Sequence, residues 1–216
     1  MKQVKQYIIL FFKSLISIKN VIFDFGQVVV HFEPKYMVEQ YVKDEEDSRL
    51  LQEVVFDRLY WDKLDLGTIS DEETLKLVKE RVPERLHDAC DKIYYNWIYN
   101  IPIINGMDEL IKELHKNPNV RIFLISNISK YFVSHIDKIP ILKEFEYMVF
   151  SSDLGVVKPS HIIFDHLCKK CSLIPEECIF IDDNENNIKG AKSFGINGYL
   201  FDGDSKKLKA YLEKIL

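Results

Sequence analysis

The most restrictive feature of this sequence is a short apolar run that ends in an acid. Val21–Phe23 leads directly into Asp24, and after Gly26 the apolar pattern resumes over Val28–Val30. A carboxylate is costly in a buried strand unless it lies at the strand end and has a task there. Gly26 lets the backbone turn tightly. The pattern predicts a central strand with Asp24 at its C-terminal edge, where open α/β sheets build their sites.

Four later segments share this pattern of a short apolar run closed by a polar or turn residue. They span residues 121–126, 147–151, 178–182 and 198–201. Such runs are typical of parallel strands that are buried on both faces. Apolar residues at helical spacing separate them, over residues 104–114, 162–171, 185–194 and 205–216. This alternation predicts an α/β fold, with a doubly wound, Rossmann-like parallel sheet of about five strands.

Residues 34–99 break the alternation, because they contain no strong strand pattern. Pro34 and Pro83 are placed to begin helices, and Ser70 precedes Glu73 at the spacing of a capping box. We therefore predict a small helical cap of roughly four helices, inserted after the first strand and able to cover the strand ends as a lid. The predicted core then comprises 18–33 and 100–216, and 1–17 form an N-terminal extension.

Composition and charge narrow the possible classes of protein. The chain of 216 residues is 47% hydrophobic and 29% charged, which suits a globular protein, and its net charge of -5 gives no basic surface for nucleic acid. The apolar segment Tyr7–Ile18 is too short and interrupted to span a bilayer, and no cleavage site follows it. We expect a cytoplasmic protein without membrane contact. Cys168 and Cys171 have metal-site spacing but no second pair, so we interpret them as a core-facing thiol and its neighbour.

Polar groups follow three other predicted strands, as Asp24 follows the first. Ser126 and Asn127 close the second strand, Lys158 lies in the loop beyond the third, and Asp182-Asp183 close the fourth. Because parallel strands end at one edge of a sheet, we expect these side chains to converge.

The converging groups meet the requirements of phosphoryl transfer. The Asp24 carboxylate can attack phosphorus and form an acyl phosphate. Mg²⁺ can be held by Asp24, the backbone carbonyl of Gly26 and one of Asp182 and Asp183, which would otherwise repel one another.

The remaining groups suit the phosphate itself. The Ser126 hydroxyl can hold phosphate oxygens, and Lys158 can neutralise both the nucleophile and the phosphate. Asn127 is equally suited to contact the phosphate or to shape its loop. The neighbouring Asn184 and Asn187 are interpreted as turn and helix-start residues.

Four such motifs in this order resemble the haloacid dehalogenase-like hydrolase superfamily, from Ile18 onward. The segments 23–30 and 180–188 are similar to its glucose-1-phosphate phosphatase branch. The resemblance implies a Mg²⁺-dependent enzyme with a small cap after the first motif. It also implies roles for the converging residues: Asp24 as nucleophile, Ser126 as phosphate-binding hydroxyl and Lys158 as the active-site lysine. Asp183 would be the main metal ligand, and Asp182 would support the metal ligands without binding the metal itself.

Gly26 departs from most phosphatases of this superfamily, which have Asp two residues after the nucleophile. That Asp protonates the leaving oxygen and later activates water, and Gly26 can do neither. His31 and Glu33 follow, and we interpret them as solvated or cap-contacting residues, with an acid–base role left open. A site without this acid is expected to favour good leaving groups, such as those of sugar 1-phosphates.

The sequence thus predicts a phosphatase that hydrolyses a small phosphorylated metabolite through an aspartyl-phosphate. A metal-independent dehalogenase is disfavoured by the paired acids, and a non-catalytic binding protein is disfavoured by the intact set of motifs. An aromatic group near the end of the cap is interpreted as packing and hinge residues: Tyr94, Tyr95, Trp97 and Tyr99. Whether one of these or Trp61 lines the substrate pocket is left open.

Overall fold

The structure is a computed structural model, and it describes residues 17–216. The predictions for the extension 1–17 and for the apolar segment that begins at Tyr7 lie outside these residues, apart from the last positions. Within the described part of the chain, no helix has the length and apolarity needed to cross a membrane.

Five parallel strands form one sheet in the order β3-β2-β1-β4-β5, as the sequence predicted. The strands are β1 (Asn20–Phe23), β2 (Arg121–Ser126), β3 (Tyr147–Phe150), β4 (Cys178–Asp182) and β5 (Asn197–Leu200). Strand β1 is central, and its last residue, Phe23, pairs with Leu124 of β2 and Ile181 of β4. Asp24 follows this residue and therefore lies in the middle of the C-terminal edge of the sheet. The strand order reverses at this point.

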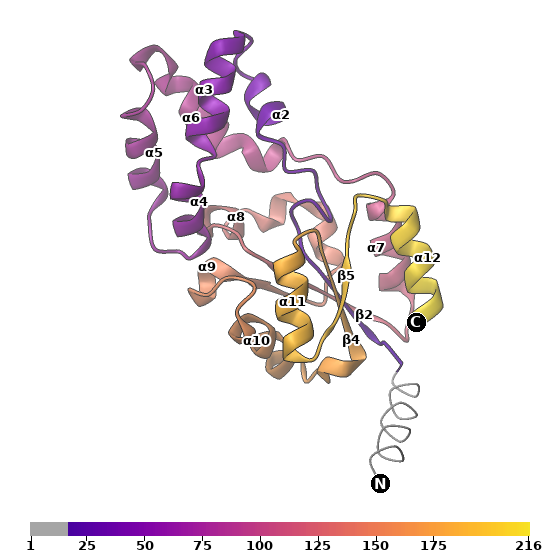
Figure 1. Cartoon of the computed structure of the whole chain (residues 1–216). Coiled ribbons are helices and arrows are strands. Elements are labelled where there is room, and N and C mark those ends of the chain that lie inside the picture. Colours follow the sequence, from indigo (N-terminus) through magenta and orange to yellow (C-terminus); the bar gives the residue numbers. More distant parts are fainter. Residues whose placement is uncertain (1–16) are drawn as a thin grey trace.

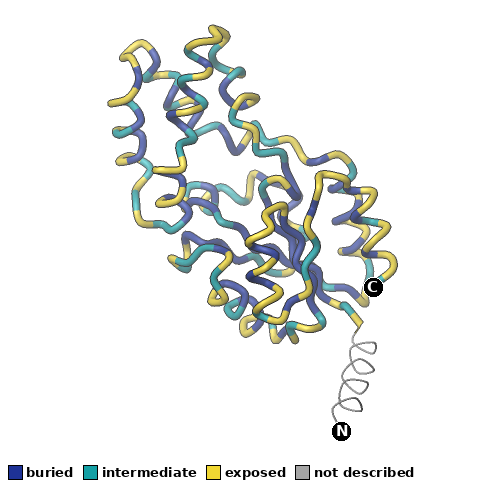
Figure 2. Tube along the Cα trace, in the orientation of Figure 1, coloured by how far each residue is buried: buried dark blue, intermediate teal, exposed yellow. Residues whose placement is uncertain are grey.

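Helices cover both faces of the sheet (Figure 1). One face carries α7 (Met107–Lys116) and α12 (Ser205–Ile215), and the other carries α10 (His161–Cys171) and α11 (Glu185–Phe194). Successive residues of β1 divide between the two cores: Val21 and Phe23 pack on the first face, and Ile22 packs on the second. Figure 2 shows the result, with buried strands between helices whose outer sides are exposed. Cys168 is buried in the second core and Cys171 is partly buried, as expected for residues of one helix.

The segment 34–99 is helical and gathers beyond one end of the sheet (Figure 1). Its α-helices are α2 (Pro34–Glu39), α3 (Glu45–Val55), α4 (Arg58–Asp65), α5 (Asp71–Lys79) and α6 (His87–Asn96). They enclose a core of their own, and Met37 of α2 and Trp61 of α4 also join the first core of the sheet. The Ser70 hydroxyl accepts a hydrogen bond from the Glu73 N–H at 3.1 Å, which is half of the expected capping box. The segment thus contains five α-helices rather than the roughly four expected. Pro83 precedes a 3₁₀ turn (Glu84–Leu86) instead of beginning α6.

Several short elements have no counterpart in the sequence predictions. They are α8 (Lys130–Val133) and α9 (Ser151–Leu154), with 3₁₀ turns over Trp97–Tyr99, Ile136–Lys138, Pro140–Glu144 and Pro175–Glu177. Helices of one turn are too short to display a repeating apolar face, so sequence periodicity does not reveal them. Helix α9 matters for the site, because it connects β3 to the loop of Lys158 and contacts α4.

Candidate active site

A pocket of about 240 Å³ lies at the C-terminal edge of the sheet. The sheet side supplies the lining residues Asp24, Gly26, Ser126, Asn127, Lys158 and Asp183, and the helical segment supplies Arg58, Trp61 and Asp65. Every residue that the sequence nominated as nucleophile, phosphate contact or direct metal ligand is therefore in one place. Asp182, nominated to stand behind the metal, is fully buried and does not line the pocket, but it contacts Lys158, which does.

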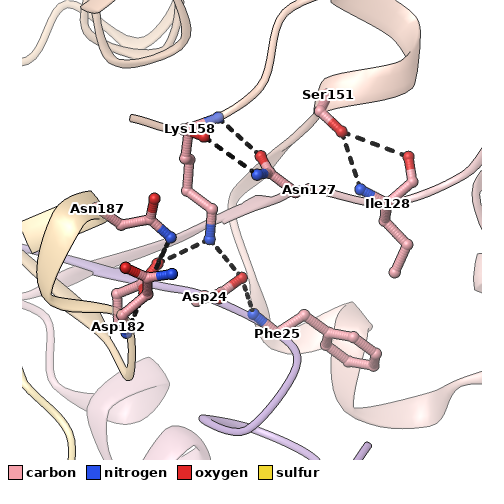
Figure 3. Close-up of polar contacts among 9 residues, drawn as sticks. Asp24, Phe25, Asn127, Ile128, Ser151, Lys158, Asp182 and Asn187 are labelled. Carbon is pink, nitrogen blue, oxygen red and sulfur yellow. Dashed lines mark hydrogen bonds and ion pairs between the residues drawn. The ribbon is translucent and has the colours of Figure 1, made fainter. Parts of the chain in front are cut away.

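Lys158 joins the two central acids. Its Nζ lies 2.7 Å from an Asp24 oxygen and 2.8 Å from an Asp182 oxygen, and the side chain is almost fully buried (Figure 3). Burial alone would lower the pKa of this lysine, but the two carboxylates outweigh it and raise the pKa. Lys158 therefore carries a fixed positive charge at the sheet edge.

Asp24 is held in position from two sides. Its Oδ1 accepts a hydrogen bond from the Phe25 N–H at 2.7 Å and pairs with Lys158 (Figure 3). Burial, reinforced by the negative charge of Asp182, raises the pKa of Asp24 above its usual range despite the lysine. One lysine does not balance the acids at this edge, so a further cation would favour the ionised nucleophile.

Asp182 and Asp183 have different surroundings. Asp182 is fully buried, and its oxygens accept hydrogen bonds from Lys158, from the Asn184 N–H at 2.8 Å and from the Asn187 side-chain amide at 3.0 and 3.1 Å. Asp183 is more exposed and lines the pocket. Burial, followed by repulsion from Asp182, raises the pKa of Asp183.

The carboxylates fit a hard divalent cation. Oxygens of Asp24, Asp182 and Asp183 lie within 4.8 Å of one another, and the Gly26 backbone borders the same pocket. Mg²⁺ prefers a few carboxylate and carbonyl oxygens and retains several waters, which the open side of this pocket allows. The hydrogen bonds of Asp182 leave Asp183 as the freer ligand.

Asn187 is a residue whose role sequence reasoning missed. It was interpreted as a helix-start residue, and it does lie in the first turn of α11. Its side chain nevertheless points back to the strand end and holds both Asp182 oxygens (Figure 3). The cap of α11 is Asn184, whose side chain accepts from the Asn186 N–H at 2.9 Å.

Asn127 fixes the loop that carries Lys158. Its Oδ1 accepts from the Lys158 N–H at 2.8 Å, and its Nδ2 donates to the Lys158 carbonyl at 3.3 Å. These contacts favour the loop-shaping role of the two that the sequence left open. The same loop packs tightly on α11 at Gly190, where a Cβ would lie 2.6 Å from the Pro159 Cβ. A glycine at this position thus lets the lysine loop approach the helix closely.

The turn after Asp24 differs from the sequence interpretation. The left-handed residue is Gln27, with φ 57°, and Gly26 has no positive φ. A Cβ built on Gly26 would meet nothing within 4 Å. The pocket therefore has free space at residue 26, where most phosphatases of the superfamily that the sequence resembles carry an acid.

The helical segment reaches the site through α4. The Ser151 hydroxyl donates to the Asp65 carbonyl at 2.6 Å and accepts from the Ile128 N–H at 2.9 Å, so it joins α4 to the loop after β2. Asp65 itself is 5% exposed and lines the pocket. Burial raises the pKa of its carboxyl to about 6. Sequence reasoning missed this residue, which looks like one polar position of a helix.

Some of the aromatic and polar residues whose role the sequence left open line the pocket, and the others do not. Trp61 and Trp97 line the pocket. Tyr94 and Tyr95 pack on each other, and Tyr99 is exposed. His31 and Glu33 are not among the lining residues, in keeping with the interpretation that they are solvated or contact the cap.

Comparisons with known proteins agree with this geometry. The sequence model of the haloacid dehalogenase-like hydrolase family matches residues 18–195. The D-ribitol-5-phosphate phosphatase of Bacteroides thetaiotaomicron is 26% identical over 200 residues, which are 84% of this chain and 91% of that protein.

Two solved structures share the fold. A predicted HAD-like family hydrolase from Porphyromonas gingivalis superposes with a TM-score of 0.68 at 20% identity, over 92% of this chain and 98% of that one. A HAD family enzyme from Bacteroides thetaiotaomicron, in complex with magnesium and inorganic phosphate, gives a TM-score of 0.65 at 21% identity, over 88% and 98% of the two chains.

Proposed function

Because this chain belongs to the haloacid dehalogenase-like hydrolase family, we propose that it is a Mg²⁺-dependent phosphatase of a small phosphorylated metabolite. The observation that carries the proposal is the buried Lys158 between Asp24 and Asp182, beside a third carboxylate. A dehalogenase-type displacement needs no metal and gains nothing from this acidic cluster. The related D-ribitol-5-phosphate phosphatase supports phosphate chemistry.

In the proposed reaction, Asp24 attacks phosphorus and the substrate alcohol leaves. Lys158 holds the nucleophile and neutralises phosphate charge, and Ser126 at the end of β2 offers its hydroxyl to the phosphate oxygens. Mg²⁺ held by Asp24, Asp183 and the Gly26 carbonyl, with Asp182 behind them, would offset the charge of the phosphoryl group. Water then hydrolyses the aspartyl-phosphate and restores Asp24.

We propose a sugar or polyol phosphate as the substrate class. The pocket of about 240 Å³ accommodates a small molecule. Its lining combines the indoles of Trp61 and Trp97 and the guanidinium of Arg58, from the helical segment, with the side chain of Gln27 in the loop after β1. Aromatic faces with a few placed polar groups suit a molecule that has both carbon faces and hydroxyls.

The proposed function predicts Mg²⁺-dependent release of phosphate from a panel of sugar, polyol and aryl phosphates. Chelation with EDTA is expected to abolish turnover, and added Mg²⁺ to restore it, because the ionised acids need a cation. Phosphate release in a colorimetric assay measures this. Turnover of a haloacid that survives EDTA would favour the dehalogenase. Mg²⁺ binding by calorimetry without turnover of any phosphate would favour a binding protein.

The glycine at position 26 predicts a preference within this panel. It supplies no proton to the leaving oxygen, so a hexose 1-phosphate is expected to give a higher kcat/KM than the 6-phosphate of the same hexose. The anomeric alkoxide is the less basic leaving group and needs protonation less. Steady-state kinetics on the two isomers test this, and faster turnover of the 6-phosphate contradicts it.

A further inference from the structure

Asp65 is a buried carboxylate in the pocket without a partner. It is 5% exposed, and among the described residues none forms a hydrogen bond or an ion pair with its carboxyl group. Arg58, two turns earlier on the same face of α4, pairs with Asp62 instead. A buried carboxylate without a partner costs stability, so its environment calls for an explanation other than folding.

The position of Asp65 is fixed relative to the phosphate-binding loop. Ser151 connects the Asp65 carbonyl to the Ile128 N–H, two residues after Ser126. The contact of α4 with α9 supports the same alignment. Asp65 thus borders the pocket from the helical segment, whereas Asp24 and Lys158 border it from the sheet. A phosphate held on the sheet side would direct its leaving group toward the helical segment.

We propose that Asp65 is the general acid and base of the reaction, in place of the side chain that residue 26 lacks. This inference rests on the proposed phosphatase function. As Asp24 forms its bond to phosphorus, the bond to the leaving oxygen breaks, and that oxygen takes the proton of the Asp65 carboxyl. In the second step, the Asp65 carboxylate takes a proton from water as the water oxygen attacks phosphorus. The bond to Asp24 then breaks, and phosphate is released with Asp65 protonated again.

The charges around Asp65 suit both halves of this cycle. Burial raises its pKa to about 6, against the opposing effect of Arg58 and Lys158 and with a further rise from Asp62. Other charged groups near this part of the pocket are Asp24 and Asp183 on the sheet side, and Lys130 of α8 beside Gly67. Near neutral pH both protonation states of Asp65 are populated, as an acid–base catalyst requires.

The raised pKa of Asp65 also bears on the expected preference for 1-phosphates. The protonated fraction falls about tenfold per pH unit above the pKa. A substrate that needs protonation of its leaving group should therefore lose rate as pH rises, whereas a substrate with a good leaving group should not. The preference for 1-phosphates is expected to widen from pH 6 to pH 8.

The test compares Asp65→Asn with the wild type on two substrates, hexose 6-phosphate and 4-nitrophenyl phosphate, with Mg²⁺ present. We expect kcat/KM for the 6-phosphate to fall by about 10²–10⁴. For the aryl phosphate, kcat/KM should change by less than about threefold, because its leaving group needs no proton. Its kcat should fall and a burst of nitrophenol should appear, since hydrolysis of the aspartyl-phosphate loses its base. The ratio of the two kcat/KM values should depend on pH in the wild type only.

Matched variants separate this role from a structural one. Asp88→Asn removes an exposed carboxylate from α6, another helix of the segment 34–99, and should leave the ratio unchanged. Asp65→Asn should keep or raise Tm at pH 8, because it removes a buried charge. The free space at residue 26 allows a rescue: Gly26→Asp in the Asp65→Asn background should restore turnover of the 6-phosphate.

The outcomes distinguish this inference from the proposed function. Equal loss on both substrates, or no loss on either, overturns the role of Asp65 and leaves the phosphatase intact. Absence of Mg²⁺-dependent turnover of 4-nitrophenyl phosphate by the wild type would overturn the phosphatase and the role of Asp65 together.

Discussion

Asp24→Asn is expected to lower phosphatase turnover by at least about a thousandfold while the protein stays folded. The amide keeps the shape of the carboxylate but has no nucleophilic oxygen anion. Lys158 retains its contact with Asp182 in this variant, and the repulsion between Asp24 and Asp182 is removed. Stability should therefore be unchanged or slightly higher, so the lost activity reports chemistry rather than unfolding.

The measurement is Mg²⁺-dependent phosphate release together with trapping of the phosphorylated protein. Acid-quenched wild type should carry phosphate on the peptide that contains Asp24, and the variant should carry none. Asp165→Asn, on the outer side of α10, is the matched control and should behave as wild type. Turnover by Asp24→Asn within tenfold of wild type would place the nucleophile elsewhere.

The sheet and its polar edge were predictable because their signals are local. Strands β1, β2 and β4 are apolar runs closed by a side chain with chemistry, which is Asp24, Ser126 and Asp182 in turn. Parallel topology then brings those ends together without further information. Residues far apart in sequence, such as Asp24 and Asp182, meet because their strands are paired neighbours.

The contribution of the helical segment was not predictable in the same way. Asp65 is one of many polar residues in an amphipathic helix, and only the orientation of α4 on the sheet brings it into the pocket. That orientation depends on distant contacts such as Ser151 with the Asp65 carbonyl. Asn187 was placed correctly on a helix, but sequence spacing does not show that its amide turns back to Asp182. Specific contacts of this kind follow from tertiary structure.

Lys158→Met is expected to have the largest effect on stability, a loss of about 3–5 kcal/mol at pH 8 in EDTA. The lysine side chain is almost fully buried between Asp24 and Asp182, so methionine would fill its volume and leave two buried carboxylates without their cation. Urea unfolding measures the change. Lys169→Met, which breaks an exposed pair with Asp165, is the matched control and should cost less than about 1 kcal/mol.

The sign of the pH dependence makes this prediction specific. Without the lysine, the pKa of the Asp24 carboxyl rises further above its value in the unfolded chain. Stability from such a group is present at low pH and is lost as pH rises through the folded-state pKa. The loss in Lys158→Met should therefore be smaller at pH 5 than at pH 8, and smaller again in the Asp24→Asn background, where one of the two charges is absent. A pH-independent loss of less than about 1 kcal/mol would mean that the acids do not depend on Lys158 for their burial.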